Sequence, residues 1–149
     1  MHIHTEITIN SPVPQIYNAL TNFADYPKWN PSIEVIHRHD DQYLIVIKNP
    51  GDKAMKFPAK LYMKQNIELR WRGRIFGLPG VFTGIHCFKL TQISVNETKL
   101  AHYEHFSGIL ALLIWPFIKN KTLNNFIKIN AALKKFVEKQ EKISTADNI

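Results

Sequence analysis

The sequence predicts an α+β fold in which an antiparallel sheet packs against helices on one side. Two observations predict it. Most of the chain before Gly108 falls into short runs in which apolar and polar side chains alternate, as they do in half-buried strands. The remainder changes to a helical period, with apolar residues three and four positions apart and lysines between them.

The composition predicts one domain. A chain of 149 residues with 45% hydrophobic content can bury one substantial core but is short for two. We expect the domain to cover residues 1–143 and the tail, 144–149, to be frayed. The single cysteine, Cys87, excludes an intramolecular disulfide, and the start of the chain lacks the charged and apolar segments of a secretory signal. A cytoplasmic location is therefore expected.

The first elements are a strand and one or two short helices. Residues 2–10 alternate isoleucine with polar side chains and predict a strand. A short helix is predicted over 12–20, with Ser11 as its N-cap and Pro12 at its first position. The following segment, 22–31, combines turn residues with three aromatic residues and predicts a turn or a second short helix.

Three strands are predicted next, over 33–39, 42–48 and 56–66, with turn residues at 40–41 and 49–52 between them. The run "ELRWRGRI" then alternates an apolar set with a cationic set: Leu69, Trp71, Gly73 and Ile75 against Arg70, Arg72 and Arg74. We interpret the cationic side as the solvated outer face of the sheet, and an anionic partner is the alternative.

Two long strands and a long helix complete the chain. The runs 82–93 and 98–108 predict strands joined by a tight turn at 94–96. Helix follows from about Gly108, bent or begun near Pro116. Its apolar side is predicted from helical spacing to comprise Leu123, Phe126, Ile127, Ile129, Leu133, Phe136 and Val137.

The most apolar stretch, "FSGILALLIWPFI" at 106–118, is too short to span a membrane, which takes about 20 apolar residues. The net charge of +7 favours anionic partners in general, but the basic residues form no run, so no nucleic acid partner is expected. Contact with an anionic membrane surface is an alternative, because Lys119 and Lys121 follow Trp115 and Phe117.

Several of these segments together resemble a known family. The segment 11–31, "SPVPQIYNALTNFADYPKWNP", is followed by "LRWRGRI", by "GIHCFKL" and by "EHFSG" before the long helix. This combination resembles the SRPBCC superfamily, also called START-like or helix-grip proteins, over residues 3–140. The superfamily includes the birch pollen allergen and polyketide cyclase/dehydrase-like proteins, and the sequence looks closest to an uncharacterised bacterial ligand-binding subfamily.

The resemblance implies a curved antiparallel sheet of about seven strands wrapped around a long C-terminal helix, with two short helices after the first strand. It also implies a deep hydrophobic cavity between sheet and helix, which the segment 106–118 would line.

A hairpin turn centred near Val95 places residues whose numbers sum to about 190 opposite each other. His86 then faces Glu104, Phe88 faces His102 and Gly84 faces Phe106 on one side of the sheet, which the resemblance implies is the concave one. A histidine beside a glutamate in an apolar cavity would act as a structural hydrogen-bonded pair, orient a ligand, or serve as a catalytic acid and base. His86 and Glu104 are therefore the candidate catalytic residues, with the three roles left open.

No metal and no cofactor are expected. The chain has seven histidines, but the pairs His2/His4 and His37/His39 offer two ligands each. Cys87 should point away from the cavity because it alternates with His86, and no nucleophile or phosphate-loop motif is present.

We therefore expect the cavity to bind a hydrophobic or amphipathic small molecule: a lipid, an isoprenoid or a polyketide-like compound. The expected ligand-binding residues are Trp29, Phe57, Trp71, Phe76, Phe82, His86, Phe88, His102, Glu104, Phe106, Leu113 and Phe117. One alternative is a cyclase or dehydratase that acts on a polyketide-like substrate. Another is a lipid-transfer or membrane-surface protein. A monomer or weak homodimer is expected.

Overall fold

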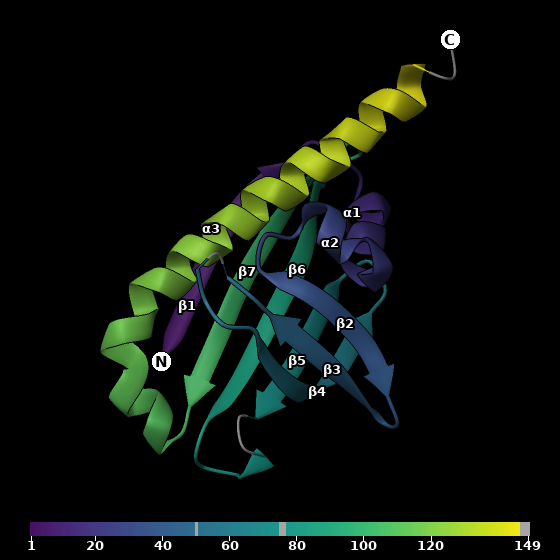
Figure 1. Ribbon diagram of the computed structural model, residues 1–149. Coiled ribbons are helices and arrows are strands. Elements are labelled where there is room, and N and C mark those ends of the chain that lie inside the picture. The colour runs from purple at the N-terminus through teal and green to yellow at the C-terminus, as the bar shows by residue number, and fades with distance from the viewer. Residues whose placement is uncertain (50, 75–76, 147–149) are drawn as a thin grey trace.

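The computed structural model of the protein describes residues 1–49, 51–74 and 77–146 (Figure 1). Its elements are β1 (His2–Ile9), α1 (Val13–Thr21), η1 (Phe23–Asp25), α2 (Tyr26–Trp29), β2 (Ile33–His39), β3 (Gln42–Ile47), β4 (Met55–Lys64), β5 (Glu68–Arg74), β6 (Thr83–Ser94), β7 (Glu97–Ser107) and α3 (Ile109–Ala146). The predicted α+β class, with short helices after the first strand and a long C-terminal helix, is confirmed.

The seven strands form one antiparallel sheet in the order β1-β7-β6-β5-β4-β3-β2. The first strand pairs with the last, from His2 opposite His105 to Ile9 opposite Thr98. Figure 1 shows that α3 runs diagonally across one face of the curled sheet and that α1 and α2 lie on the same side. The helices are thus segregated to the concave face, and the other face is left to solvent.

The alternation of side chains in β5 separates these two faces. Leu69 and Trp71 are buried, whereas Arg70 and Arg72, which alternate with them, are exposed. On the same outer face the cations of Lys60 and Arg70 lie over the ring of Tyr62. The convex face is therefore the cationic face that the sequence predicts.

The core lies between the concave face and α3. Phe126, Ile129, Leu133 and Val137 of the helix are each at most 3% exposed. Side chains of this kind contribute about 1.5–3 kcal/mol each when fully buried. The prediction that Ile127 belongs to the same face is wrong: its side chain is 53% exposed, because it follows Phe126 by about 100° around the helix.

The start of α1 also differs from the prediction. The N-cap is Pro12, not Ser11, and no side chain caps the helix. The Ser11 hydroxyl is buried and donates to Gln15 Oε1 at 3.2 Å, while its carbonyl oxygen accepts a hydrogen bond from the Thr98 hydroxyl at 2.8 Å. Ser11 therefore joins the helix to the sheet.

Helix α3 begins at Ile109, earlier than Pro116, which lies inside it. Figure 1 shows the helix changing direction within its first turns, drawn in green. An internal proline removes one hydrogen bond and crowds the preceding turn, so a bend there is expected. Gly108, just before the helix, has φ +110°, and a Cβ there would lie 2.4 Å from the Val81 carbonyl oxygen. None of the described helices is both long enough and apolar enough to span a bilayer.

Candidate functional site

The last hairpin brings the candidate acid and base together. Strand β6 ends at Ser94 and β7 begins at Glu97, which confirms the predicted turn. His86 is paired with Glu104, Phe88 with His102 and Gly84 with Phe106, in the register that the sequence predicts. Because strand side chains alternate, all six positions lie on one face of the sheet.

A pocket of about 330 Å³ lies between this face and α3. Its apolar walls include Phe57, Trp71 and Phe106 from the sheet and Ile114, Ile118 and Phe126 from the helix. His86 and Glu104 are the titratable side chains at its buried end, with side-chain exposures of 6% and 16%. The pocket thus combines apolar walls with a small buried polar group.

The exposed end of the pocket is polar. Lys121 of α3 reaches Asp52, in the connection between β3 and β4, with Nζ 2.6 Å from Oδ2. The hydrogen bond from Lys121 holds the pKa of the Asp52 carboxyl below its usual range. Thr122 and Asn125 of α3 also line this end. The ion pair ties the helix to the loop at the entrance.

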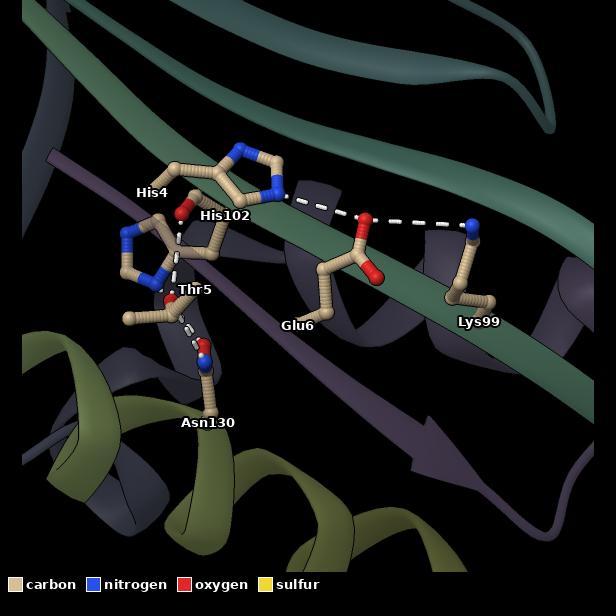
Figure 2. Close-up of polar contacts among 6 residues, drawn as sticks. All are labelled: His4, Thr5, Glu6, Lys99, His102 and Asn130. Carbon is tan, nitrogen blue, oxygen red and sulfur yellow. Dashed lines mark hydrogen bonds and ion pairs between the residues drawn. The ribbon is translucent and has the colours of Figure 1, made fainter. Parts of the chain in front are cut away.

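Buried polar side chains continue inward from Glu104 as a chain of hydrogen bonds. Glu104 Oε2 lies 3.3 Å from His86 Nδ1, and His86 Nε2 lies 3.0 Å from His102 Nε2. His102 Nδ1 is 2.7 Å from Asn130 Oδ1, and Asn130 Nδ2 donates to Thr5 Oγ1 at 2.9 Å. Figure 2 shows His102, Thr5 and Asn130 on the side of the sheet that faces α3, whereas His4, Glu6 and Lys99 lie on the other side.

Aromatic rings cover both imidazoles. Trp71 stacks on His86 with ring centroids 4.1 Å apart and planes 7° apart, and Phe126 stacks on His102 at 3.7 Å and 7°. Rings in these positions keep water from the imidazole faces. This packing is the physical reason for the pKa shifts of the cluster.

Burial lowers the pKa of His86 to about 3 and that of His102 well below its usual value. Burial raises the pKa of Glu104 to about 8. Ion pairing between carboxylate and imidazolium would shift the pKa values in the opposite directions, so desolvation dominates here. The cluster is therefore neutral near pH 7, and Glu104 carries a proton.

Comparison with solved structures finds the same architecture at low sequence identity. The di-domain ARO/CYC BexL of the BE-7585A biosynthetic pathway matches with a TM-score of 0.74 and 14% identity over 93% of this chain and 46% of that one. The Zhui aromatase/cyclase from Streptomyces sp. R1128 matches with a TM-score of 0.71 and 10% sequence identity over 94% of both chains. A START superfamily protein from Mycobacterium smegmatis matches with a TM-score of 0.69 and 17% sequence identity over 93% of this chain and 98% of that one.

The chain has a helix-grip fold, which it shares with these START and aromatase/cyclase structures. It spans about half the length of BexL. The sequence matches no family model and no curated protein. A fold of this kind hosts different functions, so ligand and chemistry have to be argued from the residues of the site.

The helix-grip pocket contains half of the residues that the sequence predicts for it. The predicted residues that line it are Phe57, Trp71, Phe82, His86, Glu104 and Phe106. Trp29, Phe88 and His102 are buried but do not line the pocket; Phe88 packs on Trp71, which does, with ring centroids 5.9 Å apart. Phe76 lies outside the described residues. Ligand contact by any of these residues remains a prediction.

The two helical residues predicted for the pocket lie elsewhere. Leu113 is 67% exposed and Phe117 is 82% exposed, whereas Ile114 and Ile118 line the pocket. One residue along a helix is a rotation of about 100°, so the positions next to the predicted ones face inward. The prediction for Leu113 and Phe117 is wrong for this reason.

Sequence reasoning missed two members of the polar cluster, Thr5 and Asn130. Asn130 is 3% exposed on the helix face that also carries Phe126 and Leu133. Thr5 follows Ile3 by two residues in β1, so both side chains lie on the same face of the strand. A polar residue on an otherwise apolar face is the signal that could have found both.

No metal site is seen among the residues that the structure describes, where no group of three or more His, Cys, Asp or Glu side chains could hold an ion. His86 and His102 are joined directly, Nε2 to Nε2, at 3.0 Å. Cys87 is buried and does not line the pocket.

Proposed function

We propose that this protein binds a small hydrophobic or amphipathic molecule, of the lipid, isoprenoid or polyketide-like classes, in the pocket between sheet and helix. The observation that carries the proposal is a pocket of about 330 Å³ with apolar walls and a buried His86–Glu104 pair. Ligand pockets span about 300–1,000 Å³, and this volume is at the lower end. A compact ring system or a short chain suits it better than an intact phospholipid.

Affinity would come mainly from burial of the ligand's apolar surface. Each 100 Å² of apolar area removed from water contributes about 2.5 kcal/mol, at about 25 cal/mol per Å². Trp71 is 2% exposed and is held in place by stacking on His86, so the wall is largely preformed. The single polar region at the buried end would orient the ligand.

Native mass spectrometry of the protein purified from its source organism tests this proposal, followed by extraction and identification of the bound molecule. Replacing Ile118 by tryptophan fills the pocket, because Ile118 lines it. Replacing Phe117 by tryptophan is the matched control, because that side chain is 82% exposed on the other side of the helix. We expect a stoichiometric adduct that is lost in I118W and kept in F117W. An adduct that persists in I118W, or none in the wild type, contradicts the proposal.

A second candidate is a cyclase or dehydratase acting on a polyketide-like substrate. The observation that favours it is an acid at the pocket wall, Glu104, with a pKa of about 8 and its Oε2 3.3 Å from His86 Nδ1. A catalytic acid works best when its pKa is near the operating pH. In an enzyme, Glu104→Gln would abolish turnover while ligand binding persists, because an amide cannot release the proton. Unchanged turnover would exclude this role.

The exposed side of α3 favours a membrane-surface role as an additional property. Ile109, Leu112, Leu113 and Phe117 are 67–82% exposed in the first turns of the helix that lines the pocket. With a net charge of +7, this apolar side suits an anionic bilayer surface. We expect salt-sensitive binding to vesicles that contain phosphatidylglycerol; no binding at low salt would exclude the role.

Location and oligomeric state stay predictions. We expect a cytoplasmic protein, in agreement with the reduced, buried Cys87. We expect a monomer or weak homodimer, and sedimentation equilibrium over a range of concentrations would test it.

A further inference from the structure

The hydrogen bonds of the buried cluster have directions that can be derived one after another. A backbone carbonyl only accepts, so the Thr5 hydroxyl donates its hydrogen to the His102 carbonyl oxygen at 3.1 Å. The Thr5 oxygen is then the acceptor for the Asn130 amide nitrogen at 2.9 Å. This orientation turns the Asn130 amide oxygen toward His102 Nδ1, 2.7 Å away (Figure 2). His102 Nδ1 therefore carries a hydrogen.

The same reasoning extends to the pocket wall. A neutral His102 with a hydrogen on Nδ1 has a lone pair on Nε2, so the hydrogen between the two rings belongs to His86 Nε2. His86 then has its lone pair on Nδ1, which faces Glu104 Oε2 at 3.3 Å. Oε2 of Glu104 is left as the donor in this pair. A carboxylic acid with its hydrogen on Oε2 keeps Oε1 as a pure acceptor.

An ionised cluster gives Oε1 the same role. If the proton moves from Oε2 onto His86, Oε1 becomes part of a carboxylate and still accepts. A hydrogen on Oε1 would require Oε2 to accept from His86 Nδ1. His86 would then carry hydrogens on both nitrogens and be a cation stacked under Trp71 without a counter-charge. Oε1 of Glu104 is therefore a hydrogen-bond acceptor both in the neutral cluster and in the cluster whose proton has moved to His86.

Oε1 is also accessible from the pocket. No hydrogen bond to it is made within the part of the chain that the structure describes, and it is not a fully buried atom. It lies beside Gly84, where a Cβ would come within 2.8 Å of it, and Gly84 lines the pocket. The absence of a side chain at Gly84 therefore leaves space in front of an unused acceptor.

We infer that the pocket selects ligands with a hydroxyl group, an alcohol or a phenol, that donates a hydrogen bond to Glu104 Oε1. Groups that only accept, such as a ketone, an ether or a carboxylate, leave this oxygen without a partner and are disfavoured. The inference rests on the proposed binding function and adds the polar group that the ligand carries at its buried end.

Isothermal titration calorimetry with two probes tests it: 2-naphthol, which donates, and 2-methoxynaphthalene, which has the same rings and only accepts. We expect 2-naphthol to bind about tenfold more tightly, the value of one hydrogen bond of this kind. Equal affinities would overturn the inference and leave the binding function standing. If neither probe binds, the proposed function and the inference both fail.

Two variants locate the effect. In Glu104→Gln the amide nitrogen donates to His86 Nδ1 and the amide oxygen takes the place of Oε1, so the preference for 2-naphthol should persist. In Glu104→Leu the acceptor is gone, and both probes should bind alike. A preference that survives in Glu104→Leu would overturn the assignment of Oε1. Loss of the preference in Glu104→Gln would overturn the derived hydrogen-bond directions, and near-ultraviolet circular dichroism verifies that each variant is folded.

Discussion

The proton on Glu104 can be tested without any ligand, by replacing Glu104 with glutamine. The amide has the shape of the protonated acid, and its N–H can donate to His86 Nδ1 as the acid O–H does. At pH 6 the unfolded wild type is already ionised, because this pH lies 1.5 units above the ordinary pKa of 4.5. We therefore expect the variant to be more stable than the wild type by about 2 kcal/mol, to within about 1 kcal/mol for the exchanged hydrogen bond.

The two proteins should diverge as the pH rises. Burial raises the pKa of Glu104 to about 8 in the fold, from an ordinary value of 4.5. A raised pKa in the folded state gives stability that is complete below the unfolded pKa and is lost as the pH approaches the folded pKa. Between pH 6 and pH 8 the wild type should lose about 2 kcal/mol relative to the variant, because each pH unit in this window is worth about 1.36 kcal/mol.

Urea unfolding at pH 6, 7 and 8, followed by tryptophan fluorescence, measures this difference. Subtracting one protein from the other cancels the titration of all groups except those of the cluster. Glu34→Gln, which makes the same substitution at a side chain that is 48% exposed on β2, is the matched control. A difference that does not change with pH refutes the raised pKa. A loss of about 3–5 kcal/mol at pH 6 would instead indicate that the variant broke a buried ion pair.

Three further substitutions have distinct expected outcomes. Asn130→Ala leaves the buried His102 Nδ1–H without an acceptor and should cost about 1–3 kcal/mol of unfolding free energy in urea titrations; a loss below 0.5 kcal/mol would speak against the hydrogen bond. Gly84→Ala places a methyl group 2.8 Å from Glu104 Oε1 and should weaken 2-naphthol binding about tenfold by calorimetry, and unchanged affinity would mean that the carboxyl group does not face the pocket there. Phe117→Ser should change stability by less than about 0.5 kcal/mol but reduce co-sedimentation with anionic vesicles; unaltered co-sedimentation would exclude this side chain from membrane contact.

The pairing of His86 with Glu104 could be predicted from the sequence because two strict constraints determine it. A tight turn fixes the register of a hairpin, and the two-residue period of a strand fixes the face of each side chain. The structure places the turn at Val95 and Asn96, between the ends of β6 and β7. Once these are known, no tertiary information is needed to place the two residues side by side.

The orientation of the first turns of α3 could not be predicted in this way. The segment from Ile109 to Ile118 is apolar on every side, so the spacing of its apolar residues does not indicate which side of the helix faces the sheet. Packing against the sheet decides which residues face inward, and it selects Ile114 and Ile118 over Leu113 and Phe117. Ile127 was misplaced for a related reason, because hydrophobicity alone does not distinguish it from its buried neighbour.

The hydrogen bonds between Asn130, Thr5 and His102 could not be predicted from the sequence, since these residues are far apart in the chain and meet only when α3 crosses β1.

The buried polar cluster is also the strongest physical reason to assign a function to the pocket. Burying several polar side chains is commonly no more favourable than an apolar replacement of the same shape. Yet the cluster lies between the helix and the sheet, in a core whose other members are mostly apolar. It ends at the pocket, where Oε1 of Glu104 has no partner within the described residues. A cluster that served stability alone would have no reason to leave an acceptor open beside Gly84, whereas a cluster that orients a ligand requires one.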